Sequence, residues 1–200
     1  SIRDAQRAKY LVEYEYRIIP CPLEDDQWEL YMDKCHKINK LKQALKSDKI
    51  SPTQKEKYIN QLETLYRDRA GIIKKCDNKE NYIEEMLNAL PSDARILIYG
   101  DDLEQLGRFK IKLNSMNKQY FEYTGDKDPA KTRPVMLKEF RQGIRKILLA
   151  VGCLDEGIDI PACDAAIFVS SSTSERQFIQ RRGRVLRNAP GKKQAWVFDF

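Results

Sequence analysis

The chain has 200 residues, of which 42% are hydrophobic and 33% are charged, and its net charge is +6. This apolar content is enough for a globular core, and no apolar run is long enough to span a membrane. The five cysteines are widely spaced without a C-x-x-C pair, so they indicate neither a disulfide framework nor a zinc cluster, and a reducing cytoplasm fits best. The positive charge fits an anionic partner and equally fits an ordinary lysine-rich surface.

The first predicted element is a half-buried strand at residues 11–20. Val12, Tyr14, Tyr16 and Ile18 alternate with charged neighbours, and a period of two is typical of such a strand. The sequence starts within a polar, helix-like segment and without an initiator methionine, so we expect it to be part of a longer protein.

Two antiparallel helices are expected over about residues 24–75. Apolar residues in the first helix recur at spacings of three and four: Trp28, Tyr31, Cys35, Ile38, Leu41 and Leu45. Ser51, Pro52 and Gln54 predict the start of the second helix as N-cap, first helical residue and capping-box partner. The helices are rich in lysine, which leaves two interpretations open: a solvated packing appendage, or a contact with nucleic acid or a partner protein. His36 has no further ligands near it and predicts no metal site.

A third helix ends before Pro91, and short apolar runs then alternate with helical stretches. These runs are RILIYG, YFEYTG, KILLAV, DAAIFVS and QAWVFDF. Continuous apolar strands with interleaved helices are typical of a parallel sheet covered on both faces. We therefore predict an α/β fold, an open parallel sheet sandwiched by helices, over residues 91–200, with an N-terminal α-helical hairpin extension and lead-in helix over residues 24–90.

The candidate contact residues follow the predicted strands. Ligands of open parallel sheets bind beyond the carboxyl ends of the strands, although a glycine or threonine after a strand is by itself more often a turn. Residues of this kind are Gly100, Asp101, Thr124, Gly125, Val151, Gly152 and Cys153.

Two segments carry sharper signals. In VGCLDEGIDIP, Gly157 allows close backbone approach, and Asp159 can accept a hydrogen bond from a ribose hydroxyl or hold an arginine. In QRRGRVLR, Arg184 and Arg187 project from one face of a predicted helix, where guanidiniums can grip phosphate oxygens. We expect this helix to end at the same sheet edge as the Gly157 loop. The joint occurrence of the two segments favours a phosphate site over a solvated basic face.

These segments resemble the C-terminal RecA-like domain of superfamily 2 helicases and translocases. QRRGRVLR matches motif VI of that family, Q-x-x-G-R-x-x-R, at every defined position, and ILLAVGCLDEGIDIP is similar to motif V. RILIYG stands where motif IV is expected. The resemblance covers about residues 91–200, and the strand within residues 1–23 looks like the segment that crosses from the N-terminal motor domain.

The resemblance implies a role for each matched position. Arg184 and Arg187 would be arginine fingers that reach the γ-phosphate of ATP, and Gln180 would sense the nucleotide. Gly157 and Asp159 would line the same cleft near the ribose. The residues that would contact a nucleic-acid backbone are Gly100, Asp101, Thr124, Gly125, Val151, Gly152 and Cys153.

The sequence departs from one branch of the family. Many DEAD-box RNA helicases carry threonine where Val151 stands and histidine where Gln180 stands, and Val151 cannot donate a hydroxyl to a phosphate. The residues of the two motifs are more similar to those of the DNA-directed branch, which includes the repair helicase XPB and the motors of restriction and phage-defence systems. Double-stranded DNA is therefore the expected partner, while a non-catalytic docking module and an RNA helicase half remain alternatives.

Two family motifs are missing from the sequence. It contains neither a G-x-x-x-x-G-K-[ST] loop nor a D-E-x-[DH] tetrad. The resemblance thus implies that ATP with Mg²⁺ is held mainly by an N-terminal RecA-like domain of the same parent chain, and that residues 1–200 alone are inactive as an ATPase.

Overall fold

The computed structural model describes residues 11–47, 50–124, 133–151, 163–170, 183, 185–189 and 191–200. The chain divides into two compact units. One consists of Ser1–Pro20 together with Asn78–Phe200, and the other of Cys21–Asp77. Each unit is considered by itself below.

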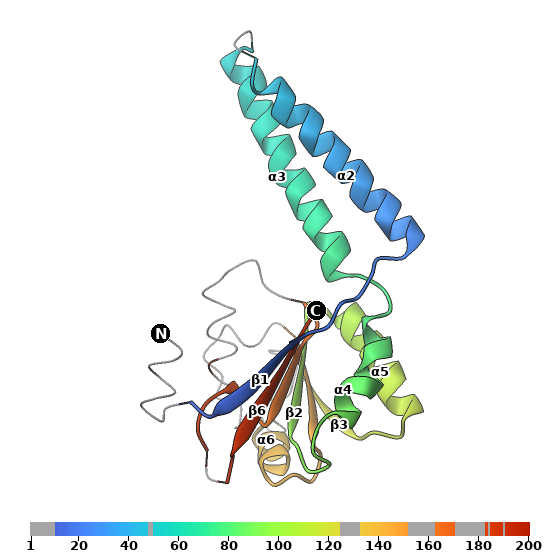
Figure 1. The fold of residues 1–200 in the computed structure, drawn as a ribbon, viewed down its shortest axis with the longest axis vertical. Coiled ribbons are helices and arrows are strands. Elements are labelled where there is room, and N and C mark those ends of the chain that lie inside the picture. The colour runs from blue at the N-terminus through green and yellow to red at the C-terminus, as the bar shows by residue number, and fades with distance from the viewer. Residues whose placement is uncertain are drawn as a thin grey trace. The chain divides into compact units, whose positions relative to one another are not determined.

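The larger unit is built on a parallel sheet, which confirms the predicted fold class. Its six strands within the described residues follow the order β1-β6-β5-β2-β4-β3, and every neighbouring pair is parallel. The strands are β1 (Glu13–Ile18), β2 (Ile96–Gly100), β3 (Tyr120–Tyr123), β4 (Ile147–Val151), β5 (Ala165–Phe168) and β6 (Gln194–Asp199). The first and last strands of the chain lie side by side, blue and red in Figure 1, with Tyr16 opposite Val197.

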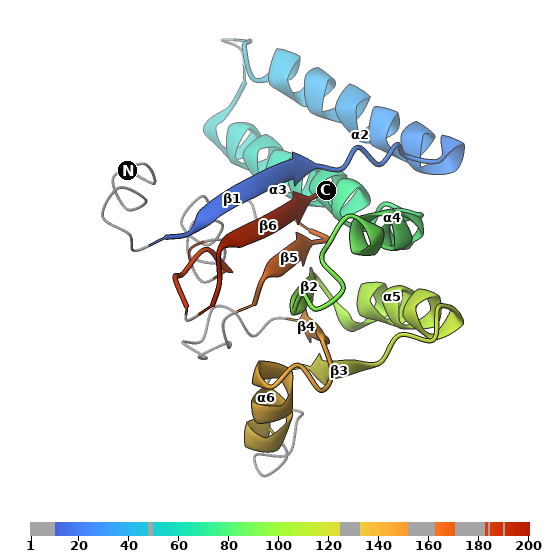
Figure 2. The ribbon, with the colours of Figure 1, turned by 60° about the horizontal axis from the view of Figure 1, so that its bottom comes forward.

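Alternating residues of the strands fill two cores, one on each face of the sheet. Ile96 and Ile98 pack into a cluster with side chains of α4 (Ile83–Asn88) and α5 (Leu103–Ser115). Leu97 and Tyr99, which point the other way, pack into a second cluster. Phe140 of α6 (Arg133–Arg141) belongs to the second cluster, and Figures 1 and 2 show α6 on the face opposite α4 and α5.

The helix expected before Pro91 is shorter than predicted and belongs to the sheet-containing unit. A 3₁₀ turn, η1 (Lys79–Tyr82), precedes α4. Asn78 caps η1 with a left-handed backbone at φ 70°, and this conformation ends any continuous helix from the preceding segment. Because Ile83 and Met86 are buried in the core, this helix packs with the sheet rather than with the hairpin.

The smaller unit is the predicted helical hairpin. It contains α2 (Asp25–Ala44) and α3 (Pro52–Lys74). Ser51 caps α3 by accepting a hydrogen bond from the backbone N–H of Gln54 at 3.3 Å, as expected from the sequence. Ile38 and Leu62 are buried, whereas Trp28, which was expected in the apolar seam, is 52% exposed. A two-helix hairpin covers only one side of each helix, so side chains at the margin of the seam stay in solvent.

No helix among the described residues has both the length and the hydropathy required to cross a membrane.

Candidate nucleotide and nucleic-acid interface

Five of the predicted site residues are described by the structure: Gly100, Asp101, Thr124, Val151 and Arg187. The other predicted site residues lie outside the described part of the chain: Gly125, Gly152, Cys153, Gly157, Asp159, Gln180 and Arg184.

The carboxyl ends of three neighbouring strands bring the first group together. Gly100 ends β2 and is the register partner of Val151, which ends β4. Tyr123 of β3 is opposite Ala150, so Thr124 follows at the same edge. The structure thus places Gly100, Thr124 and Val151 beside one another, and the exposed Asp101 comes next in the chain.

Val151 contributes backbone rather than side chain to this edge. Its side chain is half-buried and packs against the cluster that contains α4 and α5. Any contact of Val151 with a phosphate is therefore limited to its main chain, which agrees with the missing hydroxyl noted in the sequence.

Gln105 connects two loops at the carboxyl edge, and its role was not inferred from the sequence. Its side chain is 2% exposed, and its Oε1 accepts hydrogen bonds from the Asp101 backbone N–H at 2.9 Å and from Ser170 Oγ at 3.2 Å. Asp102 caps α5 by accepting from the Gln105 backbone N–H at 2.8 Å. The pattern D-x-x-Q before an apolar helix is a capping-box signal, so the sequence carried a clue.

Arg187 lies elsewhere in the fold. It forms an antiparallel bridge with Leu11, just before β1 begins, and the Val12 N–H donates to the Leu186 carbonyl at 3.0 Å. Arg187 is exposed at the amino-terminal end of β1, so the expectation that the helix of QRRGRVLR ends at the carboxyl edge is wrong for this residue. Because β6 runs parallel to β5, the segment between them must return to the amino edge before β6 starts.

The segment before β6 is anchored by buried groups. Val185 and Leu186 are both 1% exposed. The Nζ of Lys192 donates to the Val185 carbonyl and, at 2.6 Å, to the Cys163 carbonyl before β5. Burial lowers the pKa of Lys192 and raises the pKa of the neighbouring Cys163 thiol to about 11. No sequence pattern predicts this contact, because a lysine in a GKK stretch is typical of a solvated turn.

An ion pair fixes the amino edge of the sheet. Arg95 donates from Nε and Nη2 to the two carboxylate oxygens of Asp164 at 2.9 and 3.0 Å, and the Arg95 backbone N–H donates to the same group at 2.9 Å. Burial acts to raise the pKa of Asp164, but the hydrogen bonds from Arg95 outweigh it and hold this pKa below its ordinary value. The pair ties the start of β2 to the start of β5. Among the described residues, no group of three histidine, cysteine or acidic side chains could hold a metal ion.

A parallel sheet with helices on both faces and loops gathered at its carboxyl edge is an α/β architecture that RecA-like domains share with other folds, so the family is identified by comparison. The chain belongs to the helicase conserved C-terminal domain family, which matches residues 78–189, and it is the C-terminal RecA-like domain of a superfamily 2 helicase or translocase. Relatives that carry this helicase domain include a translocase by name.

Curated relatives share this domain. The chain is 30% identical over 112 residues to a DNA 3'-5' translocase XPB2 of Sulfurisphaera tokodaii, covering 55% of the chain and 24% of the relative. It is 43% identical over 51 residues to the Dicer-like protein 2-2 of Aspergillus niger, covering 26% of the chain and 4% of the relative. The chain thus spans about a quarter or less of the length of these relatives.

Solved structures share the fold. The C-terminal part of the Fun30 ATPase domain has a TM-score of 0.65 at 13% identity, covering 94% of this chain and 85% of that chain. The C-terminal domain of the DEAD-box protein Dbp5 has a TM-score of 0.51 at 21% identity, covering 62% of this chain and 71% of that one.

Proposed function

We propose that this chain is the C-terminal motor half of an ATP-dependent double-stranded DNA helicase or translocase. The observation that carries the proposal is the complete match of QRRGRVLR to motif VI, together with the exposure of Arg187 beside the buried Val185 and Leu186. A guanidinium that is solvent-exposed while its chain neighbours are anchored in the core is suited to contact a partner group.

In this proposal the nucleotide is shared with an N-terminal RecA-like domain of the same protein. When bound, ATP with Mg²⁺ supplies the phosphoryl group that is transferred to water. Arg184 and Arg187 donate hydrogen bonds to that group, and their charge stabilises the negative charge that grows on it during transfer. The resemblance makes Gln180, Gly157 and Asp159 the further proposed contacts with the nucleotide.

The carboxyl edge is the proposed nucleic-acid surface of the domain. Backbone N–H groups and hydroxyls contact phosphates without reading sequence, and the edge near Gly100 and Thr124 offers both kinds of group. The proposed contacts continue through Gly125, Val151, Gly152 and Cys153, with Asp101 at the margin. Closure and reopening of the two motor domains would then move this edge along the strand.

Double-stranded DNA is the proposed substrate, and duplex RNA is the alternative. The packing of the Val151 side chain into the core supports the DNA branch, since a threonine hydroxyl typical of DEAD-box RNA helicases is absent. The relative from Sulfurisphaera tokodaii is a DNA translocase by name. The widely spaced cysteines further support a cytoplasmic location.

The test is Arg187→Ala in the longer protein that carries both motor domains. We expect DNA-stimulated turnover of ATP to fall by roughly 10³ to 10⁵-fold with little change in ATP affinity, because an arginine finger acts on the transition state. Arg187→Lys should rescue poorly, since an ammonium cannot form the planar fork. Turnover would be measured with duplex DNA and with duplex RNA, and residues 1–200 alone should show none.

The control is Arg67→Ala, which removes an exposed arginine of the hairpin. If Arg187→Ala folds normally and hydrolyses ATP within a few-fold of wild type, the docking-module alternative becomes the better explanation. If duplex RNA stimulates ATP turnover more strongly than duplex DNA does, RNA rather than DNA is the substrate.

A further inference from the structure

Positive charge is concentrated in one half of the hairpin. Residues 34–57 contain eight lysines and two acidic residues, a net charge of +6 that equals the net charge of the whole chain. Residues 21–33 and 58–77 together contain four basic and eight acidic residues. Like charges three or four positions apart destabilise a helix, so the lysine cluster is unfavourable for the hairpin alone and a polyanion would relieve the repulsion.

A groove of about 880 Å³ lies in this half of the hairpin. Both helices line it: Lys37, Lys40, Leu41, Thr53, Glu56, Lys57, Asn60, Gln61, Thr64 and Leu65. The α3 positions recur at intervals of three and four, so they form one stripe along the helix. At 1.5 Å per residue the stripe from Thr53 to Leu65 is about 18 Å long.

The floor of the groove is mainly apolar, and its rim has the chemistry of a phosphate-contacting surface. Lys37, Lys40 and Lys57 are exposed, and Glu56 is the single carboxylate among the lining residues. Asn60 adds a side-chain amide to the same stripe. Lysine, threonine, asparagine and glutamine side chains supply most side-chain hydrogen bonds to DNA phosphates besides arginine. Lysine stems can cover the apolar floor while their ammonium groups stay at the rim.

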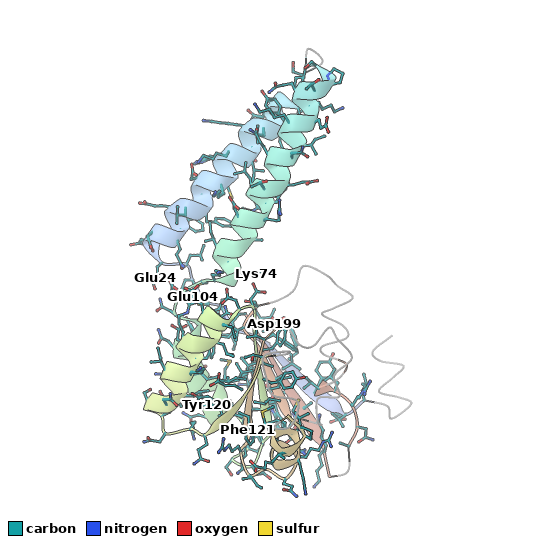
Figure 3. The ribbon with its side chains drawn as sticks, turned by 180° about the vertical axis from the view of Figure 1, so that it is seen from behind. Glu24, Lys74, Glu104, Tyr120, Phe121 and Asp199 are labelled. Atoms are coloured by element: carbon teal, nitrogen blue, oxygen red, sulfur yellow. The ribbon has the colours of Figure 1, made fainter. Side chains whose placement is uncertain are left out.

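Other cations of the hairpin are engaged in internal contacts. Arg69 lies over the rings of Tyr31 and Tyr66 at 5.8 and 5.6 Å, and Lys42 lies over Tyr66 at 5.5 Å. Tyr66 comes nine residues after Lys57, which at about 100° per residue is the opposite side of α3. These cations therefore stabilise the hairpin away from the groove. Figure 3 shows how densely long side chains cover both helices.

The lysines that line the groove are more available to bind a ligand than the cations in these internal contacts. Among the described residues, neither Lys40 nor Lys57 forms an ion pair. Lys37 pairs with Asp33 at 2.6 Å, but both side chains are about half exposed. An exposed pair of this kind contributes little, so a phosphate can replace it.

We propose that the groove lined by Lys37, Lys40 and Lys57 binds the phosphate backbone of duplex DNA. Charge complementarity identifies the occupant, because duplex DNA is a polyanion and the exposed lysines of the groove can neutralise its phosphates. The proposal rests on the proposed function and adds to it a second DNA contact, contained wholly within Cys21–Asp77.

The test measures how the affinity for DNA depends on salt. The 200-residue chain is titrated into a fluorescein-labelled DNA duplex of about 20 base pairs at several salt concentrations, with binding followed by anisotropy. The slope of log affinity against log salt should become shallower by about 0.9 for each phosphate contact that Lys37→Gln, Lys40→Gln and Lys57→Gln remove together. The corresponding triple arginine variant should keep the wild-type slope, because it keeps the charge.

The matched control removes the same charge outside the groove. Lys46→Gln, Lys55→Gln and Arg67→Gln alter exposed residues that do not line it, and the slope should stay close to wild type. An equal loss in both glutamine variants, or no loss in the groove variant, overturns the proposal. Tighter binding of an RNA duplex than of the DNA duplex overturns the choice of DNA. Thermal melting of each variant confirms folding, and the Arg187 result for ATP turnover stands independently of these outcomes.

Discussion

The buried ammonium of Lys192 joins two segments that are distant in the sequence. It donates to the carbonyls of Val185, just before Arg187, and of Cys163, just before β5. Because burial lowers the pKa of this lysine, the cost of burying the charge is offset only if both carbonyls remain in place. The position of the proposed arginine finger thus depends on an interior lysine that does not itself touch nucleotide.

Lys192→Met should therefore destabilise the larger unit. The methionine keeps the apolar length of the side chain but leaves two buried carbonyls without their donor, at about 1 to 3 kcal/mol each. The melting temperature of a domain of this size falls by about 2 to 4 °C per kcal/mol. Differential scanning calorimetry would measure the change.

Lys193→Met provides the comparison, because Lys193 is the exposed neighbour of Lys192. It should leave the melting temperature within about 2 °C of wild type, since surface substitutions rarely change stability by more than about 0.5 kcal/mol. Equal effects of the two substitutions would show that the hydrogen bonds of Lys192 contribute nothing specific.

At the scale of elements, the start of α5 organises the carboxyl edge. Asp102 caps the helix, and Gln105 in the first turn accepts from Asp101 in one loop and from Ser170 in another. One helix end thereby fixes two of the loops that follow strands β2 and β5. The proposed nucleic-acid contacts at Gly100 and Asp101 depend on this link.

Gln105→Leu should loosen that edge without removing any exposed group. The leucine fills a similar volume but cannot accept a hydrogen bond, so the Asp101 amide should exchange with solvent faster, and the affinity for duplex DNA should fall several-fold. Hydrogen exchange followed by NMR and anisotropy would measure the two effects. Gln119→Leu, at an exposed position before β3, should change neither. An unchanged Asp101 amide in Gln105→Leu would contradict the linking role.

The local pattern of apolar residues predicted most of the helices and strands correctly. It could not predict where each segment lies relative to the edges of the sheet. The continuous apolar runs around Ile98 and Leu149 indicated buried parallel strands because such strands are covered on both faces. The placement of Arg187 was mistaken because it depends on how the chain returns between parallel strands, which no local period encodes. Lys192 and the contact between Gln105 and Ser170 were missed for a similar reason, because their partners are brought near only by the folded sheet. The local contact of Gln105 with Asp101 could have been predicted from the D-x-x-Q pattern.

At the scale of the whole molecule, the two units bury very different amounts of apolar surface. The larger unit has a core on each face of the sheet, with Phe109 and Phe140 fully buried. The hairpin is held together around Ile38 and Leu62, supplemented by contacts such as the 2.7 Å ion pair between Lys34 and Asp68. Regions with few buried apolar contacts open at lower free energy than core strands do.

Hydrogen exchange should therefore distinguish the two units. Amides of α2 and α3 should exchange well before those of β2, β4 and β5, and Ile38→Ala should accelerate exchange throughout Cys21–Asp77. Loss of a buried isoleucine side chain costs about 2 to 5 kcal/mol, much of what a two-helix hairpin can supply. The strands should keep their protection, because none of their core residues contributes to the hairpin seam.

Exchange would be followed by mass spectrometry of peptides from each unit, with the exposed Ile59→Ala as the matched substitution. If Ile38→Ala accelerates exchange in the strands as much as in the helices, the units unfold as one, and the hairpin is a part of the motor core rather than a separate unit that opens on its own.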